Sequence, residues 1–93
     1  MKLPQKYKEL VPAQRRLVRE EYIRVQEGDC YFCKTPLNGD PADHVMIKKI
    51  NWKLFPKGFL QNPVHLHHSH VTGLTIGAVH ARCNAVLWQY YDE

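Results

Sequence analysis

Residues 64–86 read VHLHHSHVTGLTIGAVHARCNAV, and this stretch decides the fold that the sequence predicts. Residues 64–70 alternate between apolar and polar side chains as a strand does, and the Thr-Gly pair that follows favours a turn. Residues 74–79 form a second apolar run of the strand kind, and residues 80–91 have the apolar spacing of a helix. The predicted order over this part of the chain is therefore strand, turn, strand, helix.

The N-terminal part of the chain predicts one further helix, over residues 12–26, with apolar side chains on one face and charged ones on the others. Pro12 suits the first turn of a helix, and Gly28 is placed to end it. Residues 6–10 are expected to form a short turn before this helix. Between the helix and the histidine-rich stretch, we expect a short strand over residues 45–50.

The middle of the chain contains an aromatic group and an acid–histidine pair, each of which resembles part of a functional site. Trp52, Phe55 and Phe59 are able to stack on bases, but in so small a domain we expect them in the core. Asp43 and His44 form an acid–histidine pair within a run of turn formers, and we expect them on a surface loop.

Two short pairs of metal-binding side chains predict a zinc site. Cys30 and Cys33 are separated by two residues, and His80 and Cys83 have the same spacing. Thiolate and imidazole groups at such spacings are the ligands of tetrahedral structural zinc. A CxxC pair by itself is also typical of a redox dithiol or of two buried small residues. The second pair favours zinc, because it completes a set of four ligands.

The length of the chain also favours a structural metal. A single domain of 93 residues buries a smaller share of its surface than a larger one, so its core is marginal. Domains of this size commonly gain the missing stability from disulfides or from a metal. Three cysteines fit poorly with a disulfide framework, which needs an even number.

The densest feature of the sequence is its histidine cluster. Four of the six histidines, His65, His67, His68 and His70, fall within six consecutive positions. A histidine-rich tract also binds adventitious metal, and any one of these imidazoles is equally explained as a hydrogen-bonded core side chain. As a group on a strand shortly before a zinc-bound helix, they indicate a functional polar site.

The CxxC pair and residues 64–86 together resemble the core of HNH nucleases, especially the phage recombination endonuclease VII branch and phage HNH homing endonucleases. In that family a histidine-rich strand, a loop and a second strand lead into a helix that opens with the second zinc pair and an asparagine. This chain has these parts in the same order over residues 30–88. The resemblance implies an α+β fold, a small zinc-stapled ββα-metal (His-Me finger) domain with an additional N-terminal helix. Residues 1–93 would then be a single HNH nuclease domain, with a helical arm over residues 1–28 and a zinc-bound core over residues 29–93.

The resemblance also implies roles for individual side chains. His68 occupies the position of the general base, which takes a proton from the attacking water. His67 and Asn84 occupy the positions of the two ligands of a catalytic divalent ion. His65 and His70 match flanking histidines that steady the phosphate or the transition state. Neighbouring residues of a regular strand face opposite sides, so we expect a bend or bulge where His67 meets His68.

Two positions depart from the pattern of this family branch. It carries an acidic ligand where this chain has His67, and an acidic residue one turn after the asparagine where this chain has Leu87. Imidazole and amide groups form a softer ligand set than carboxylates, and imidazole suits transition metals better than Mg²⁺. We therefore expect Mn²⁺ or Ni²⁺ to serve as the catalytic ion at least as well as Mg²⁺.

The charge of the chain permits DNA as a partner. Thirteen Lys and Arg residues against nine Asp and Glu give a net charge of +4, a mildly basic balance that does not by itself indicate nucleic acid. The predicted phosphate contacts are Arg82 beside the site, Arg15 and Arg19 on one helix face, and Lys53 in the middle segment. The basic face of the helix is equally explained as a solvated surface.

The sequence also indicates where the protein acts. No signal peptide is apparent, and no apolar stretch approaches the roughly 20 residues of a membrane span, so we expect no membrane partner. An intracellular protein in the cytoplasm of a host cell is expected, and the resemblance suggests that a phage encodes it. A nuclease with one active site nicks one strand, so cutting both strands would need a homodimer.

Three functions fit the sequence. The first is a DNA endonuclease that hydrolyses phosphodiester bonds, and the second is a catalytically inert, zinc-stabilised nucleic-acid-binding module. The third is a partner-binding zinc protein whose histidines only pack. The presence of both His68 and Asn84 favours the endonuclease, because a module that does not cleave has no chemical need for that pair.

Overall fold

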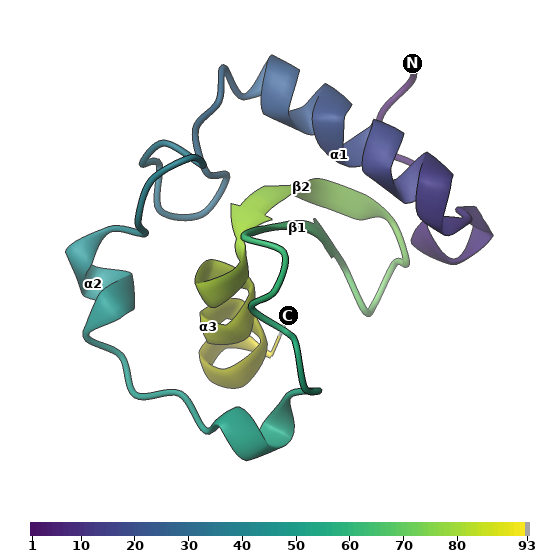
Figure 1. Cartoon of the computed structure of the whole chain (residues 1–93). Coiled ribbons are helices and arrows are strands. Elements are labelled where there is room, and N and C mark those ends of the chain that lie inside the picture. Colours follow the sequence, from purple (N-terminus) through teal and green to yellow (C-terminus); the bar gives the residue numbers. More distant parts are fainter. Residues whose placement is uncertain (93) are drawn as a thin grey trace.

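The structure of the chain, a computed structural model that describes residues 1–92, is built around a β-hairpin (Figure 1). β1 (Val64–His68) and β2 (Thr75–His80) pair antiparallel, and α3 (Ala81–Tyr91) follows β2 directly. α1 (Pro12–Val25) lies on the opposite side of the hairpin from α3. This arrangement is an α+β fold, as the sequence predicts. The other elements are short helical turns: η1 (Tyr7–Glu9), α2 (Asp43–Met46) and η2 (Trp52–Leu54).

The hairpin is irregular where the sequence predicts a bend. His67 lies opposite Gly77 and His68 lies opposite Thr75, so the register skips Ile76. Such a β-bulge bends the strands and changes the direction in which neighbouring side chains point. The bulge therefore allows two adjacent histidines to serve the same side of the hairpin.

α1 agrees with the predicted helix to within one residue at its end. Pro12 occupies its first position, where the missing N–H costs no hydrogen bond, and the helix ends at Val25. The buried face is narrower than the apolar spacing suggests. Val18 and Tyr22 are buried, whereas Leu17 and Val25 remain exposed.

The segment before α1 pairs with the start of β2. The N–H of Thr75 donates to the carbonyl of Gln5 at 2.8 Å, and the N–H of Tyr7 donates to the carbonyl of Gly73 at 2.9 Å. The Thr75 hydroxyl accepts a hydrogen bond from the N–H of Gln5 at 2.9 Å and lies 2.8 Å from the hydroxyl of Tyr22. This N-terminal segment therefore behaves as a short additional strand along β2.

The side chain of Gln26, just after α1, bonds to β2 nearer its end. Its Oε1 accepts a hydrogen bond from the N–H of Ala78 at 2.9 Å, and its Nε2 donates to the carbonyl of Ala78 at 2.9 Å. The N–H of Tyr31 donates to the same carbonyl at 3.0 Å. An amide side chain thus takes the place of a neighbouring strand at this point.

The prediction of a strand over residues 45–50 is wrong, because residues 43–46 form a helical turn. The carbonyl of Ala42 accepts a hydrogen bond from the N–H of Val45 at 2.9 Å, which closes the single helical turn α2. Val45 is fully buried while Ile47 is 80% exposed, so these two β-branched side chains do not share a buried strand face. Val45 therefore reaches the core from a helical turn and not from a strand.

The other two expectations for the middle of the chain have different outcomes. Asp43 and His44 are exposed, as expected, although they open α2 and do not lie in a loop. Trp52, Phe55 and Phe59 lie outside the main core, and Trp52 is 40% exposed. Their rings pack on one another and on α3, where they form a separate aromatic cluster.

One hydrophobic core joins the N-terminal helix to the rest of the chain. Its largest fully buried side chains are Val18, Val45, Val79, Val86, Cys30 and Cys83. Val18 comes from α1, Val79 from β2 and Val86 from α3. Residues 1–28 are therefore packed into the same core as the hairpin.

α3 buries the side that faces the hairpin. It begins at Ala81, because His80 still belongs to β2. Its buried side chains are Ala81, Cys83, Ala85, Val86 and Leu87. Trp88 and Tyr91 on the same helix are 44% and 53% exposed. Among residues 1–92, neither this helix nor any other combines the length and apolar character needed to cross a membrane.

Candidate functional site

The two predicted metal-binding pairs meet at one point. The ligand atoms of Cys30, Cys33, His80 and Cys83 all lie within 4.8 Å of one another, and the four side chains are buried. Cys30 and Cys33 lie on a tight turn, in which the N–H of Lys34 donates to the carbonyl of Cys30 at 3.0 Å. His80 ends β2 and Cys83 lies in the first turn of α3. This Cys3His cluster therefore ties the turn to both the hairpin and the helix.

Hydrogen bonding directs one ring nitrogen of His80 at the thiols. Its Nε2 lies 2.9 Å from the carbonyl oxygen of Pro36 and donates to it, because a carbonyl only accepts. The unprotonated nitrogen is then Nδ1, which lies 3.5 Å from Sγ of Cys33 and 3.6 Å from Sγ of Cys83. Zinc-binding histidines commonly donate from one nitrogen to a carbonyl and bind the metal with the other.

The thiols of Cys30 and Cys83 change each other's pKa. A hydrogen bond from Cys83 lowers the pKa of Cys30 to about 4, and the same bond, together with burial, raises the pKa of Cys83. Three thiols and one imidazole this close together are the ligand types of tetrahedral structural zinc. The cluster could therefore hold a structural metal ion, and its ligand types favour zinc.

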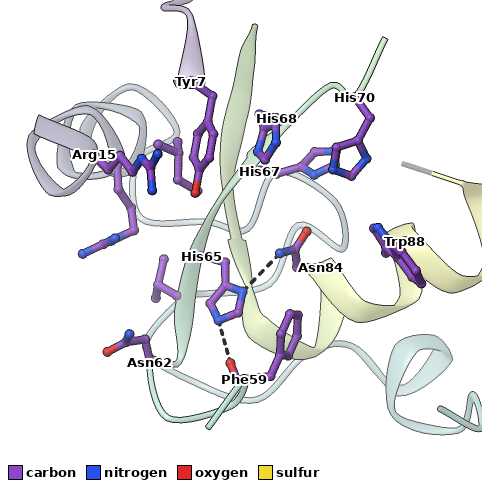
Figure 2. Close-up of a pocket in the computed structure, with 13 residues that line it drawn as sticks. Tyr7, Arg15, Phe59, Asn62, His65, His67, His68, His70, Asn84 and Trp88 are labelled. Atoms are coloured by element: carbon purple, nitrogen blue, oxygen red, sulfur yellow. Dashed lines mark hydrogen bonds between the residues drawn. The ribbon is translucent and has the colours of Figure 1, made fainter. Parts of the chain in front are cut away.

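A cavity of about 320 Å³ opens beside the hairpin (Figure 2). The predicted catalytic residues that line it are His65, His67, His68, His70 and Asn84. The histidines come from β1 and the turn after it, and Asn84 comes from α3. Because Asn84 directly follows Cys83, the Cys3His cluster fixes the position from which the amide enters the cavity.

Asn84 is oriented by His65. Nε2 of His65 lies 2.8 Å from the carbonyl oxygen of Phe59 and donates to it, so Nδ1 is left as an acceptor. The amide nitrogen of Asn84 lies 3.1 Å from this Nδ1 and donates to it. Burial lowers the pKa of His65, which keeps the ring in the neutral form that this arrangement needs. The amide oxygen of Asn84 therefore points away from His65 and toward the other histidines (Figure 2).

His68 is packed against two other rings. The ring of Tyr7 is parallel to its imidazole, with 3.8 Å between the ring centres and 7° between the planes. His70 meets the same imidazole edge to face at 4.9 Å. Burial, together with the charge of His70 and other basic neighbours, lowers the pKa of His68 to about 4. The imidazole is therefore neutral near pH 7 and able to accept a proton.

The other histidines of the cavity differ in their exposure and in their hydrogen bonds. His67 is only 2% exposed, and the bulge beside it brings it to the same cavity as His68. His70 is exposed at the start of the turn. Both ring nitrogens of His65 are hydrogen-bonded within the protein, one to the carbonyl of Phe59 and the other to the amide of Asn84.

Arg15 and Arg19, two of the predicted phosphate contacts, reach the cavity from α1. The guanidinium of Arg15 lies over the ring of Tyr7, 4.2 Å from its centre. Within the part of the chain that the structure describes, Nε of Arg15 is buried without a hydrogen-bond partner. The N-terminal helix therefore supplies positive charge to a site whose other residues lie far away in the sequence.

The other two predicted phosphate contacts lie elsewhere. Arg82 donates to the carbonyls of Met46 and Lys48, both at 3.2 Å, and so holds the segment that follows α2. Lys53 is exposed on η2. Neither belongs to the described residues that line the cavity.

Several walls of the cavity were not predicted from the sequence. They are Tyr7, Phe59, Asn62 and Trp88. The ring of Phe59 meets His65 edge to face at 4.6 Å, so an aromatic residue expected in the core supports the site. No local motif marks Tyr7, which reaches the cavity because the N-terminal segment pairs with the distant start of β2.

Comparison of the chain with protein-family models, with curated proteins and with solved structures gives no match. The fold and the site themselves define the class: a small α+β domain with a Cys3His cluster and a basic cavity lined by histidines.

Proposed function

We propose that this chain is a metal-dependent DNA endonuclease of the HNH (ββα-metal) kind, which hydrolyses phosphodiester bonds. The observation that carries the proposal is a single cavity lined by all five residues to which the resemblance assigns catalytic roles. The order of β1, β2 and α3, with the Cys3His cluster at their junction, supports the same assignment. DNA is the proposed substrate because arginines border the cavity.

His68 is the proposed general base. Its neutral imidazole takes a proton from water while the water oxygen forms a bond to phosphorus and the bond to the 3′ oxygen breaks. A general base commonly contributes about 10²–10⁴-fold to the rate. The phosphodiester brings negative charge next to the ring, which stabilises the imidazolium that results.

Arg15 and Arg19 are the proposed phosphate-binding residues. Guanidinium groups donate charge-assisted hydrogen bonds to phosphate oxygens and can do so in pairs. The unpartnered Nε of Arg15 gives this side chain a donor that is not used within the described residues. The guanidinium lies over the ring of Tyr7, 4.2 Å from its centre, and Arg15 lines the cavity together with His68.

His67 and Asn84 are the proposed ligands of the catalytic ion. The amide oxygen of Asn84 suits a cation because His65 holds the amide nitrogen on its other side. Leu87, where the family branch carries an acid, is buried and supplies no ligand. A divalent ion bound here would polarise the phosphate and neutralise charge on the departing 3′ oxygen.

Cleavage of supercoiled plasmid DNA by the zinc-loaded protein tests the proposal. Wild type should give nicked or linear product with Mg²⁺, Mn²⁺ or Ni²⁺, and folded His68→Ala should give none. His44→Ala is the matched control, because His44 is an exposed histidine on α2. No cleavage by folded wild type with any of these ions would favour a zinc-stabilised nucleic-acid-binding module. Cleavage that persists in His68→Ala would exclude His68 as the base.

A further inference from the structure

A stack of side chains runs from α1 to the end of β1. The guanidinium of Arg15 lies 4.2 Å from the centre of the Tyr7 ring, and that ring lies parallel to the His68 imidazole at 3.8 Å. Two groups so close to the centre of one ring must occupy its opposite faces. Tyr7 therefore lies between the arginine and the imidazole (Figure 2).

The backbone of the N-terminal segment fixes Tyr7 in this place. Its N–H donates to the carbonyl of Gly73 at 2.9 Å, and the adjoining residues of the two segments form a β-bridge. His68 lies opposite Thr75 in the hairpin, close to the point where this pairing occurs. The same pairing that adds the N-terminal segment to β2 therefore carries Tyr7 onto the face of His68.

A face-to-face contact restrains an imidazole in a particular way. It hinders rotation of the ring about its Cβ–Cγ bond, because a turned ring would collide with the parallel one. It leaves the two ring nitrogens open, because they lie at the edge. A hydrogen bond or an ion pair would restrain the ring as well, but it would occupy a nitrogen that proton transfer needs. Orientation of reacting groups is itself a large part of catalysis.

We propose that Tyr7 is a positioning residue that sets the plane of the His68 imidazole through this stack, and that its hydroxyl is not needed. The consequence for catalysis rests on the proposed nuclease function. The stack itself does not depend on that function. Tyr7 lies outside residues 30–88, so the resemblance to HNH nucleases assigns it no role.

The test compares Tyr7→Leu, which removes the flat ring, with Tyr7→Phe, which keeps it, in the full zinc-loaded chain. In ¹H–¹³C spectra of the histidine rings, the ring current of residue 7 should shift the His68 protons upfield in wild type and in Tyr7→Phe. In Tyr7→Leu this shift should disappear. The kcat for DNA cleavage should fall about 10- to 100-fold in Tyr7→Leu with little change in KM, and Tyr7→Phe should restore it. Tyr90→Leu, an exposed tyrosine on α3, is the matched control.

Zinc content and melting temperature show whether the variants fold. If Tyr7→Leu is destabilised, Tyr7→Met keeps apolar volume without a flat face and replaces it. Loss of the upfield shift without a fall in kcat would overturn the proposal, and so would a fall in kcat that Tyr7→Phe does not restore. Failure of wild type to cleave would instead reject the proposed nuclease, and the spectra alone would then decide. An unshifted His68 in wild type would reject the stack.

Discussion

Nδ1 of His65 accepts a hydrogen bond from the side-chain amide of Asn84 at 3.1 Å, and this bond determines which end of the amide faces the cavity. The other ring nitrogen of His65 donates to the carbonyl of Phe59 at 2.8 Å, so the two nitrogens cannot exchange roles without breaking that bond. The backbone carbonyl of Phe59 thereby fixes the oxygen of Asn84 as the end available to a cation.

Replacing His65 with phenylalanine should weaken the binding of the catalytic ion. The variant keeps an aromatic ring but has no acceptor for the Asn84 amide, which is then free to turn. Loss of a group that orients a ligand typically costs about 10- to 100-fold in metal affinity or activity. The measurement is the Mn²⁺ concentration that gives half-maximal cleavage, with His44→Phe as the control. An unchanged metal requirement would contradict the orienting role of His65.

Removal of zinc should unfold the chain. A structural zinc site contributes about 10–16 kcal/mol in finger peptides, against about 5–15 kcal/mol for the net stability of a whole domain. Circular dichroism should lose its helical signal after chelation and regain it when zinc is returned. If metal analysis shows complete removal while the spectrum and the melting curve stay the same, the Cys3His cluster is not a structural zinc site.

Gly77→Ala should destabilise the fold. A Cβ at this position would meet Oε1 of Gln26 at 2.8 Å and Cβ of Tyr31 at 2.9 Å. Overpacking of this kind costs about 1–3 kcal/mol in the free energy of unfolding, which urea denaturation measures. Gly39→Ala is the control, because its added Cβ would meet only the carbonyl of Pro36, at 3.7 Å. If both variants lose the same free energy of unfolding, the close approach of Gln26 and Tyr31 to Gly77 is not the cause of the destabilisation.

Arg19→Ala should reduce the salt dependence of DNA binding. Each side chain that neutralises a phosphate releases counterions, so loss of one contact reduces the slope of log K against log salt by about 1. Arg16→Ala is the matched control, because Arg16 is exposed on the same helix and does not line the cavity within the described residues. Equal slopes for wild type and Arg19→Ala would remove Arg19 from the DNA contact.

His67→Asp should change the preferred catalytic ion. A carboxylate supplies the oxygen ligand that Mg²⁺ favours, whereas imidazole suits transition metals. Wild type should cleave with Mn²⁺ or Ni²⁺ at least as fast as with Mg²⁺, and the variant should gain relative activity with Mg²⁺. The ratio of rates with the three ions is the measurement. A wild-type enzyme active with Mg²⁺ alone would refute the proposed ligand set.

The local features of the fold were predictable because each has a local cause. The hairpin, the helix after it and the four members of the Cys3His cluster follow from periodicity and ligand spacing within short stretches. The bulge between His67 and His68 was predictable because two adjacent strand residues were expected to serve one site. Neighbouring residues determine the periodicities and the ligand spacings, whereas the bulge was expected because the resemblance gives His67 and His68 roles in one site.

The remaining features depend on contacts between distant segments. Tyr7 reaches the cavity by pairing with the start of β2, and nothing near it in the sequence marks that contact. Val45 is the single buried residue of a four-residue helical turn, which is too short to show a periodicity that distinguishes it from a strand. Arg82 is adjacent in sequence to the cluster, yet its guanidinium is engaged by carbonyls of the middle segment.

The outer edge of β2 is occupied both at its start and near its end. The N-terminal segment bonds to Gly73 and Thr75, and Gln26 and Tyr31 bond to Ala78. An open strand edge recruits strands from other molecules, either in dimers or in aggregates. Here backbone groups of Gly73, Thr75 and Ala78 that could pair with another strand are already bonded within the chain. If the proposed nuclease forms a homodimer, we expect the two copies to meet through surfaces other than these two points of β2.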